Sequence, residues 1–249
     1  MRKQAIIISI FMLAPVIFGC TAEPGDETTS DLSFSFDFAQ EDHGWQGDFT
    51  DLPVDYDPSL YQLEFGHEPR PASLDDEGKA LMLSGRNASD DLFMYLKKGL
   101  GPDDGIKPDT TYDIVFEVEL ATNAPAGAVG IGGPPGEAVW VKVGAAPMEP
   151  VPVETEEGGR PYLLPNVDKG RQNNDGEHAI RIGDVTKEEC EILDPDAYEI
   201  KTLNNHDSPL SMQSDAAGNL WLFVGTDSGF EGETTLFYTR IEVTLSERS

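Results

Sequence analysis

An apolar side chain stands at every second position of residues 112–120, and this period of two constrains the fold more than any other feature. The apolar members are Tyr112, Ile114, Phe116, Val118 and Leu120. The residues between them include Glu117 and Glu119, so the opposite face is acidic. Side chains of a strand point to alternate faces, and the pattern therefore predicts a half-buried β-strand with a polar outer face.

Similar signals recur along the chain and define the fold class. Residues 139–143 and 237–245 also alternate, whereas residues 220–224 are apolar on both faces and indicate a central strand. Further candidates are residues 33–38, 80–84, 92–96 and 198–203. Many short strands separated by turns rich in Gly and Pro predict an all-β, two-sheet antiparallel β-sandwich, and jelly-roll topology is favoured.

Evidence for helix is sparse. Thr186 stands three residues before Glu189, which resembles a capping box and predicts one or two helical turns over residues 186–193. The sequence therefore predicts at most one or two short helices. The acidic stretch 148–160 is interpreted as a long surface loop.

The N-terminus has the pattern of a secretory signal. Arg2 and Lys3 precede an apolar run from residue 5 to residue 18, which is too short to remain as a spanning helix of roughly 20 residues. The segment 17–20, which ends in Gly19-Cys20, resembles a bacterial lipobox. The resemblance implies cleavage after Gly19 and lipid on Cys20; an ordinary cleaved secretory peptide is the alternative.

Three segments follow from this interpretation. Residues 1–19 are the lipoprotein signal peptide, residues 20–31 are the lipidated cysteine with a flexible acidic tether, and residues 32–249 form a single β-sandwich domain. The expected location is the cell envelope, at the outer membrane or cell surface, with the membrane as partner through Cys20. Lipidation would leave Cys190 as a free, buried thiol, without an intramolecular disulfide.

The charge balance excludes one class of partner. Of 17 Lys and Arg residues, two lie in the signal, which leaves 15 against 46 Asp and Glu and a net charge near −31. Such a surface repels nucleic acid. Its acidity reflects either a saline habitat or a function, and composition does not separate the two.

Several segments carry a resemblance to known proteins. Residues 36–38, 44–45, 78–85 and 106–112 resemble the opening strands of jelly-roll, galactose-binding-like carbohydrate-binding modules. A closer similarity, to a family of secreted bacterial proteins and lipoproteins, rests on residues 47–53, 89–94, 119–125, 167–170 and 224–232. The first resemblance implies a sandwich that binds glycan, and the second implies an intact domain without a particular activity.

Catalytic motifs are weak throughout the sequence. The glycine-rich stretch 130–136 holds paired prolines where a phosphate-binding helix would begin, and no G-x-S-x-G elbow occurs. A glycosidase needs two carboxyl groups across a cleft. Glu117 and Glu119 share one strand face, so a carbohydrate-active enzyme, either glycoside hydrolase or polysaccharide lyase, is the main alternative. No catalytic residue is assigned.

A structural calcium ion is the only cofactor that the sequence suggests. Calcium takes six to eight oxygen ligands, which the loops of a sandwich can supply. The candidate ligands are Asp37, Glu41 and Asp42 after the first strand, and Asp227 and Glu231 in a glycine-rich segment.

Aromatic residues are the candidates for a binding site. Trp221 lies in the doubly apolar strand and is expected in the core. Trp45 lies in a polar, glycine-rich segment and Trp140 shares its strand face with Lys142, so these two are the candidate ligand-binding residues, with capping of the core as the alternative. The sequence thus predicts a non-catalytic binding or structural domain, with polysaccharide or another envelope protein as partner.

Overall fold

The strand with the strict period of two forms the centre of a seven-stranded antiparallel sheet. The computed structural model describes residues 31–74, 77–89, 91–187 and 196–248. Strand β7 (Thr111–Thr122) pairs along its length with β15 (Glu233–Glu247). The remaining strands of this sheet are β1 (Leu32–Asp37), β4 (Glu64–Pro69), β5 (Lys79–Arg86), β12 (Glu199–Asn204) and β13 (Leu210–Gln213).

The doubly apolar segment 220–224 lies in the central strand of a second, five-stranded sheet. Strand β14 (Leu220–Ser228) pairs with β8 (Val139–Ala146) on one side and β6 (Leu92–Leu100) on the other. The sheet is completed by β11 (Ala179–Asp184) next to β8 and by β2 (Gln46–Thr50) next to β6. Strand β14 is apolar on both faces because Leu222 and Val224 pack into the main core, whereas Phe223 packs with Phe93 and Tyr95 on the opposite face.

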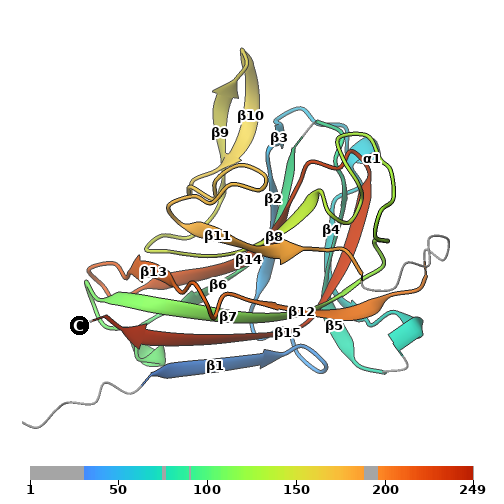
Figure 1. Cartoon of the computed structure of the whole chain (residues 1–249). Helices are drawn as coiled ribbons and strands as arrows, with labels where there is room; N and C mark the ends of the chain where they lie inside the picture. The colour runs from blue at the N-terminus through green and yellow to red at the C-terminus, as the bar shows by residue number, and fades with distance from the viewer. Residues whose placement is uncertain (1–30, 75–76, 90, 188–195, 249) are drawn as a thin grey trace, which may run out of the picture.

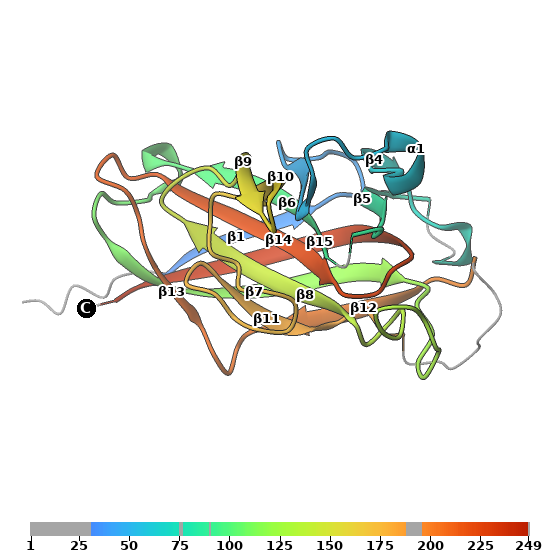
Figure 2. The ribbon, with the colours of Figure 1, turned by 90° about the horizontal axis from the view of Figure 1, so that it is seen from above.

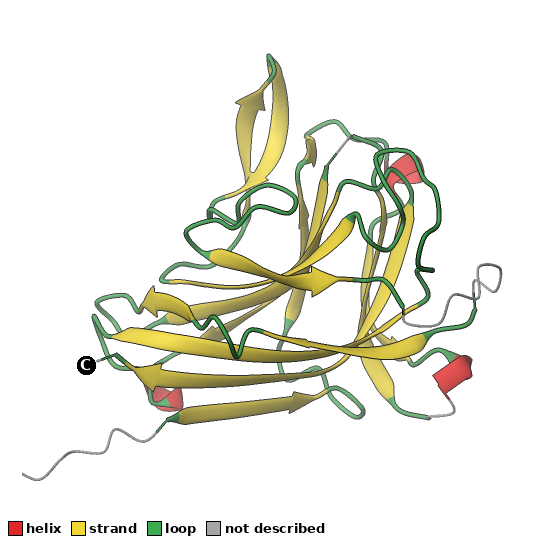
Figure 3. Cartoon of the chain, viewed as in Figure 1, coloured by secondary structure: helices red, strands yellow, loops and turns green. Residues whose placement is uncertain are grey.

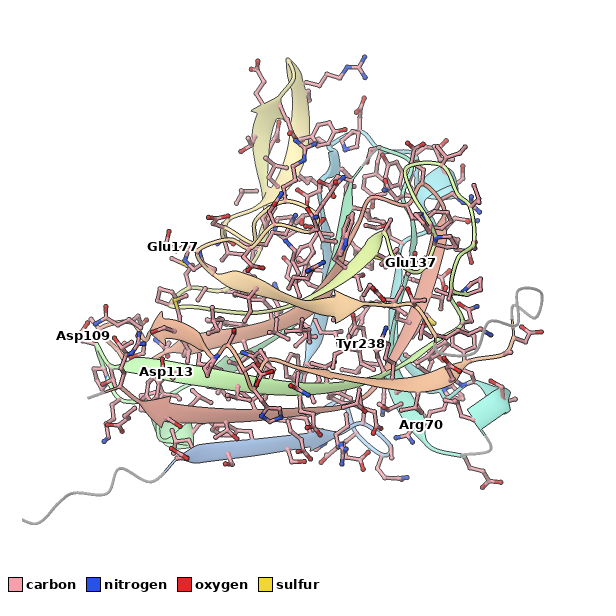
Figure 4. All side chains as sticks on the ribbon, viewed as in Figure 1. Arg70, Asp109, Asp113, Glu137, Glu177 and Tyr238 are labelled. Carbon is pink, nitrogen blue, oxygen red and sulfur yellow. The ribbon has the colours of Figure 1, made fainter. Side chains whose placement is uncertain are left out.

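The two sheets pack face to face around one large core, as Figures 1 and 3 show. Tyr238 lies between them and is fully buried (Figure 4). The chain passes from one sheet to the other between β5 and β6, β6 and β7, β7 and β8, and β14 and β15. This alternation is that of a jelly roll. The prediction of an all-β antiparallel sandwich is confirmed.

A third, smaller sheet corrects the interpretation of residues 148–160 as a loop. Strands β9 (Pro152–Glu157) and β10 (Arg160–Pro165) form a hairpin, and β10 also pairs with β3 (Leu52–Pro53). Gly158 and Gly159 both have positive φ, at 58° and 79°, as a two-residue hairpin turn requires. The hairpin projects from the side of the molecule opposite β1 (Figures 1 and 2).

Helical structure in the described part of the chain is short. It comprises one α-helix, α1 (Pro58–Tyr61), and two 3-10 turns, η1 (Ala72–Leu74) and η2 (Pro102–Asp104). Most of the helix expected over residues 186–193, with Cys190, falls outside the described residues, as do Cys20 and nearly all of the signal and tether. Among the residues with described positions, no helix has the length and apolarity needed to cross a membrane.

Candidate functional site

Charged side chains gather on the outer face of the five-stranded sheet. Asp227 of β14 stands opposite Trp140 of β8 and Phe93 of β6, and Lys142 stands opposite Gly225. Residues two apart on a strand share a face, so Asp227, Lys142, Phe93 and Trp140 all project away from the main core. The hairpin and the loop after it, residues 147–178, lie over this face (Figure 2).

Asp227 is fully buried, and two lysines share one of its oxygens. Lys169 Nζ lies 2.7 Å from Asp227 Oδ2, and Lys142 Nζ lies 3.2 Å from the same atom. The backbone N–H of Gln172 donates a third contact to Oδ2 at 2.9 Å. Lys142 also donates to the carbonyl oxygens of Lys169 and Asn174, at 2.7 and 2.8 Å. Burial of three ions is thus compensated by pairing and hydrogen bonds.

Asp51 and Asp91 complete the group, which we call the charged cluster: Asp51, Asp91, Lys142, Lys169 and Asp227. Lys169 Nζ lies 3.0 Å from Asp51 Oδ2 and 5.0 Å from the centroid of the Phe93 ring. Asp51 has a φ of 63°, a left-handed conformation that aspartate tolerates better than most residues. This turn separates β2 from β3.

Burial favours the neutral form of each side chain in the cluster, whereas pairing with an opposite charge favours the ionised form. Burial, reinforced by the charge of Asp227, raises the pKa of Asp91 to about 8. Burial also raises the pKa of Asp51, although Lys169 opposes the rise. Burial lowers the pKa of Lys142, whereas for Lys169 the surrounding carboxylates outweigh burial and raise the pKa. The cluster therefore holds a proton on Asp91 at neutral pH.

The loop that carries Lys169 is held by its neighbour Asp168. Asp168 Oδ1 accepts the N–H of Gly170 at 2.9 Å, and Oδ2 accepts the N–H of Glu177 at 3.1 Å. Glu177 marks the bend of this loop in Figure 4. These two backbone hydrogen bonds, the first most strongly, lower the pKa of the Asp168 carboxyl. The loop is thus shaped to present Lys169 and the N–H of Gln172 to Asp227.

A pocket with a volume of about 490 Å³ opens beside the charged cluster, between the hairpin and this loop. Its wall includes Tyr162, Leu164, Pro165 and Val167, and its floor includes Asp51, Asp91 and Lys169. The rim is formed by Ser89, Glu157, Gly158, Arg160, Asp168, Gly170 and Arg171. Volumes of this order suit a small ligand or one or two units of a polymer.

Comparisons with known proteins report only loose structural likeness. No protein-family model and no curated protein matches the sequence. The carbohydrate-binding module TmCBM61 in complex with β-1,4-galactotriose has a TM-score of 0.33 at 9% identity, over 82% of this chain and 89% of that one. TmCBM27, described for mannan recognition, has a TM-score of 0.35 at 13% identity, over 88% and 99%.

A third similar structure is the CBM22-1–GH10 part of Clostridium thermocellum xylanase 10B with xylohexaose. Its TM-score is 0.37 at 14% identity, over 88% of this chain and 29% of that one. All three TM-scores lie below 0.5 and all three identities below 25%. Likeness of this degree says nothing about the ligand of this chain.

The structure corrects one of the two tryptophan predictions. Trp45 is only 2% exposed and packs edge-on against Phe36 and Phe38, with ring centroids 5.5 and 6.3 Å away. Its segment is polar, but Phe36 of β1 and Phe38, which follows β1, pack against the indole and bury it in the core. Trp45 therefore has no free face for a sugar ring.

Trp140 is half-buried on the same face as the charged cluster. A Cβ atom placed on Gly229 would lie 3.2 Å from its ring, so the ring packs closely against that backbone. It is not among the residues that line the pocket. Its role as a ligand-binding residue stays a prediction.

Neither of the two carboxylate sets that the sequence suggests for calcium converges on one point in the described part of the chain. Asp37 accepts the N–H of Ala39, Asp42 accepts that of Gly44, and Glu41 lies 3.3 Å from His43, so each completes a local contact. In the other set, Glu231 is exposed while Asp227 is buried with its lysines. Within the described ranges, the carboxylates that converge are those of Asp51, Asp91 and Asp227.

The acidic pair considered for catalysis lies elsewhere. Glu119 accepts the hydroxyl of Thr239 at 2.8 Å and lies 3.4 Å from Arg240, while Glu117 lies 3.5 Å from His206. Both project from the seven-stranded sheet, away from the pocket. Both glutamates are paired with neighbouring side chains at the surface, as charged residues on a solvated strand face commonly are.

Sequence reasoning missed the charged cluster, yet two signals pointed to it. Lys142 is a charged residue among the valines of β8, and Asp227 follows the doubly apolar segment 220–224 within the same strand. Moreover, four segments that carry the resemblance to secreted bacterial proteins, residues 47–53, 89–94, 167–170 and 224–232, each contribute one member. They meet only through the fold, because more than a hundred residues separate the first from the last.

Removing Lys142 tests the stabilising role of the cluster. Lys142→Met deprives Asp227 of a buried partner, and we expect the free energy of unfolding to fall by about 3–5 kcal/mol, measured by urea denaturation. Lys107→Met is the control, since Lys107 is 59% exposed and pairs with Glu247 at the surface. Its effect should stay within about 1 kcal/mol. Equal, small effects would contradict the role of the cluster.

Asp168 gives a pH-dependent prediction. Its folded-state pKa lies below the ordinary value, so its stabilisation is present above that value and is lost as the pH falls through the lowered pKa. Asp168→Asn should cost about 1 kcal/mol at neutral pH, allowing for solvent screening, and this cost should disappear in acid as the Asp168 carboxyl becomes protonated. Urea titrations of both proteins across this range, with the exposed Asp55→Asn as control, measure the difference. A cost that persists in acid would refute the assignment.

Proposed function

We propose that the chain is an exported lipoprotein, anchored through Cys20, whose sandwich binds a neutral glycan in the pocket beside the charged cluster. The single observation that carries the binding proposal is the composition of this pocket. One wall is aromatic and apolar, and the floor and rim carry polar groups that converge on the same space.

A sugar ring matches both parts of the pocket. Its C–H face packs against an apolar wall such as Tyr162, Leu164 and Pro165. Its hydroxyl groups both donate and accept hydrogen bonds. Asp51 and Asp91, whose side chains are each 11% exposed, accept from such hydroxyls, and Arg160 and Arg171 donate to them.

The charge of the lining supports a neutral ligand. The lining holds four acidic residues, Asp51, Asp91, Glu157 and Asp168, against three basic ones, Arg160, Lys169 and Arg171. A nearly balanced pocket is unusual on a chain whose mature part has a net charge near −31. The long-range field of such a chain also repels anionic polymers, so a neutral polysaccharide is favoured.

The position of the pocket supports attachment to a surface. Strand β1 begins at Leu32, directly after the proposed tether, and the hairpin projects on the opposite side (Figure 1). Twelve extended residues reach about 40 Å at most. Lipid on Cys20 would therefore join the domain at β1, opposite the hairpin, through a tether long enough to let the pocket turn away from the membrane.

Affinity gels with neutral polysaccharides test the binding proposal. The full-length protein in detergent should be retarded by at least one of galactan, xylan or mannan, and Tyr162→Ala should weaken binding at least about tenfold, which corresponds to about 1.4 kcal/mol. Phe65→Ala, which removes an exposed aromatic outside the pocket, should bind as the wild type does.

Three results of this experiment would overturn parts of the proposal. Absence of retardation by every polymer would rule out the neutral glycan, and equal retardation of Tyr162→Ala would rule out the pocket. Release of reducing ends that disappears in Asp91→Asn would favour the enzyme. A structural calcium ion stays a proposal, and loss of binding in the presence of a chelator would support it.

Membrane fractionation tests the anchor. The wild-type protein should be recovered with membranes and incorporate labelled fatty acid, whereas Cys20→Ser should do neither. One thioether-linked lipid with a second acyl chain is sufficient for stable attachment. A Cys20→Ser protein that still carries the label would contradict lipidation at this residue.

A further inference from the structure

The two oxygens of Asp227 have different surroundings. Oδ2 receives the ammonium of Lys169, the ammonium of Lys142 and the N–H of Gln172, at 2.7, 3.2 and 2.9 Å. Oδ1 is buried and has no hydrogen-bond donor among the residues whose positions are described. Asp91 adjoins it: one carboxylate oxygen from each of Asp51, Asp91 and Asp227 lies within 4.8 Å of the others.

The unsatisfied oxygens are closed to solvent. Asp91 Oδ1 and Asp227 Oδ1 are buried atoms without a hydrogen bond in the described part of the chain, and Asp51 Oδ2, also buried, has the Lys169 ammonium 3.0 Å away. An unpaired buried oxygen is costly, and a ligand in the pocket does not reach these atoms. Their partner must come from within the cluster, and a proton on Asp91 is the smallest one that serves.

We propose that Lys169 and Asp227 condense to an intramolecular amide bond between Nζ and Cγ, with Asp91 as the proton donor to the departing oxygen. The groups already have the required contacts. Nζ is in contact with the carboxylate it would attack, and Gln172 N–H and Lys142 surround Oδ2, where negative charge develops in the tetrahedral intermediate. Oδ1, which has none of these contacts, is the oxygen that leaves, and Asp91 is a neighbouring carboxyl group that can supply its proton.

The step balances without another reactant. Asp51, 3.0 Å from Nζ, accepts a proton from the Lys169 ammonium, and the free amine attacks Cγ of Asp227. Asp91 gives its proton to Oδ1 as the Cγ–Oδ1 bond breaks, and the proton that nitrogen then loses restores Asp91. The proton held by Asp51 completes the departing hydroxide. The C–N bond replaces a C–O bond, and one water molecule is released.

The environment favours this reaction over a lasting ion pair. Condensation replaces two buried charges with a neutral amide and removes their desolvation cost. Contact between the reacting groups removes most of the entropic barrier. The raised pKa of Asp91 keeps the proton donor loaded at neutral pH. Lys169 is the closer of the two amines to the Asp227 carboxylate, at 2.7 Å against 3.2 Å for Lys142, and it is the one in contact with Asp51, which can accept its proton.

Such a bond would join β14 covalently to the loop at the floor of the pocket. Its two residues are 58 positions apart in the chain. Lipid on Cys20, as proposed above, would leave Cys190 without a disulfide partner in the chain, and an amide would supply a cross-link that does not depend on redox conditions. This inference does not require that the pocket bind glycan.

Peptide mass spectrometry of the denatured, digested wild-type protein tests the proposal. We expect a branched peptide that contains Lys169 and Asp227, with the summed mass of its two arms less one water, and no tryptic cleavage at Lys169. Lys97 and Asp48 are the internal control. They lie 3.3 Å apart, and Lys97 is 5% exposed, but the two carboxyl groups beside its Nζ are partly open to solvent, 27% for Asp48 and 43% for Glu149, and should yield linear peptides.

Two variants test separately whether Lys169 forms the bond and whether Asp91 is needed for its formation. Lys169→Arg should give linear peptides only, and Asp91→Asn, which keeps the shape but donates no acidic proton, should leave most of the protein unlinked. Linear peptides alone from the wild-type protein would overturn the proposal. An undiminished bond in Asp91→Asn would overturn the role of Asp91.

Discussion

The buried carboxylate of Asp227 is the interaction on which the functional face depends. It lies on the outer face of the five-stranded sheet with no exposed surface, bound by Lys142 from β8 and Lys169 from the covering loop. An ion in such a place is stable only when it is paired and hydrogen-bonded. The buried carboxylate of Asp227 is therefore stable only when the loop that supplies Lys169 and the N–H of Gln172 covers this face of the sheet.

The covering segment is attached at two places, and the pocket lies between them. At its start, Lys97 of β6 donates to the carbonyl oxygen of Pro150 at 2.9 Å and lies 3.0 Å from Glu149. At its end, the charged cluster holds the loop around Lys169. The hairpin between these attachments stands upright on β3 and leaves the apolar side of β10 to form a wall. A rigid sandwich thus positions a polar and an aromatic surface across one opening.

The β-sandwich could be predicted from the sequence because the signals for its strands are local. The period of two from Tyr112 to Leu120 and the doubly apolar segment at β14 follow directly from the geometry of a strand, whatever the rest of the chain does. The Gly158-Gly159 turn was also a local hairpin signal, but the acidic, proline-bearing composition around it favoured a loop. The prediction that Trp45 binds ligand was wrong because its packing partners, Phe36 and Phe38, lie on another segment of the chain.

The charged cluster was beyond such reasoning because its five members come from five separate segments. Only the strand register brings Lys142 and Asp227 together, and only a loop of particular shape adds Lys169. Hydrogen exchange of Asp227→Ala tests this account most directly. It predicts faster exchange over residues 166–178, with β7 and β15 as protected as in the wild type. Unchanged exchange in residues 166–178 would contradict the claim that Asp227 holds this loop on the sheet.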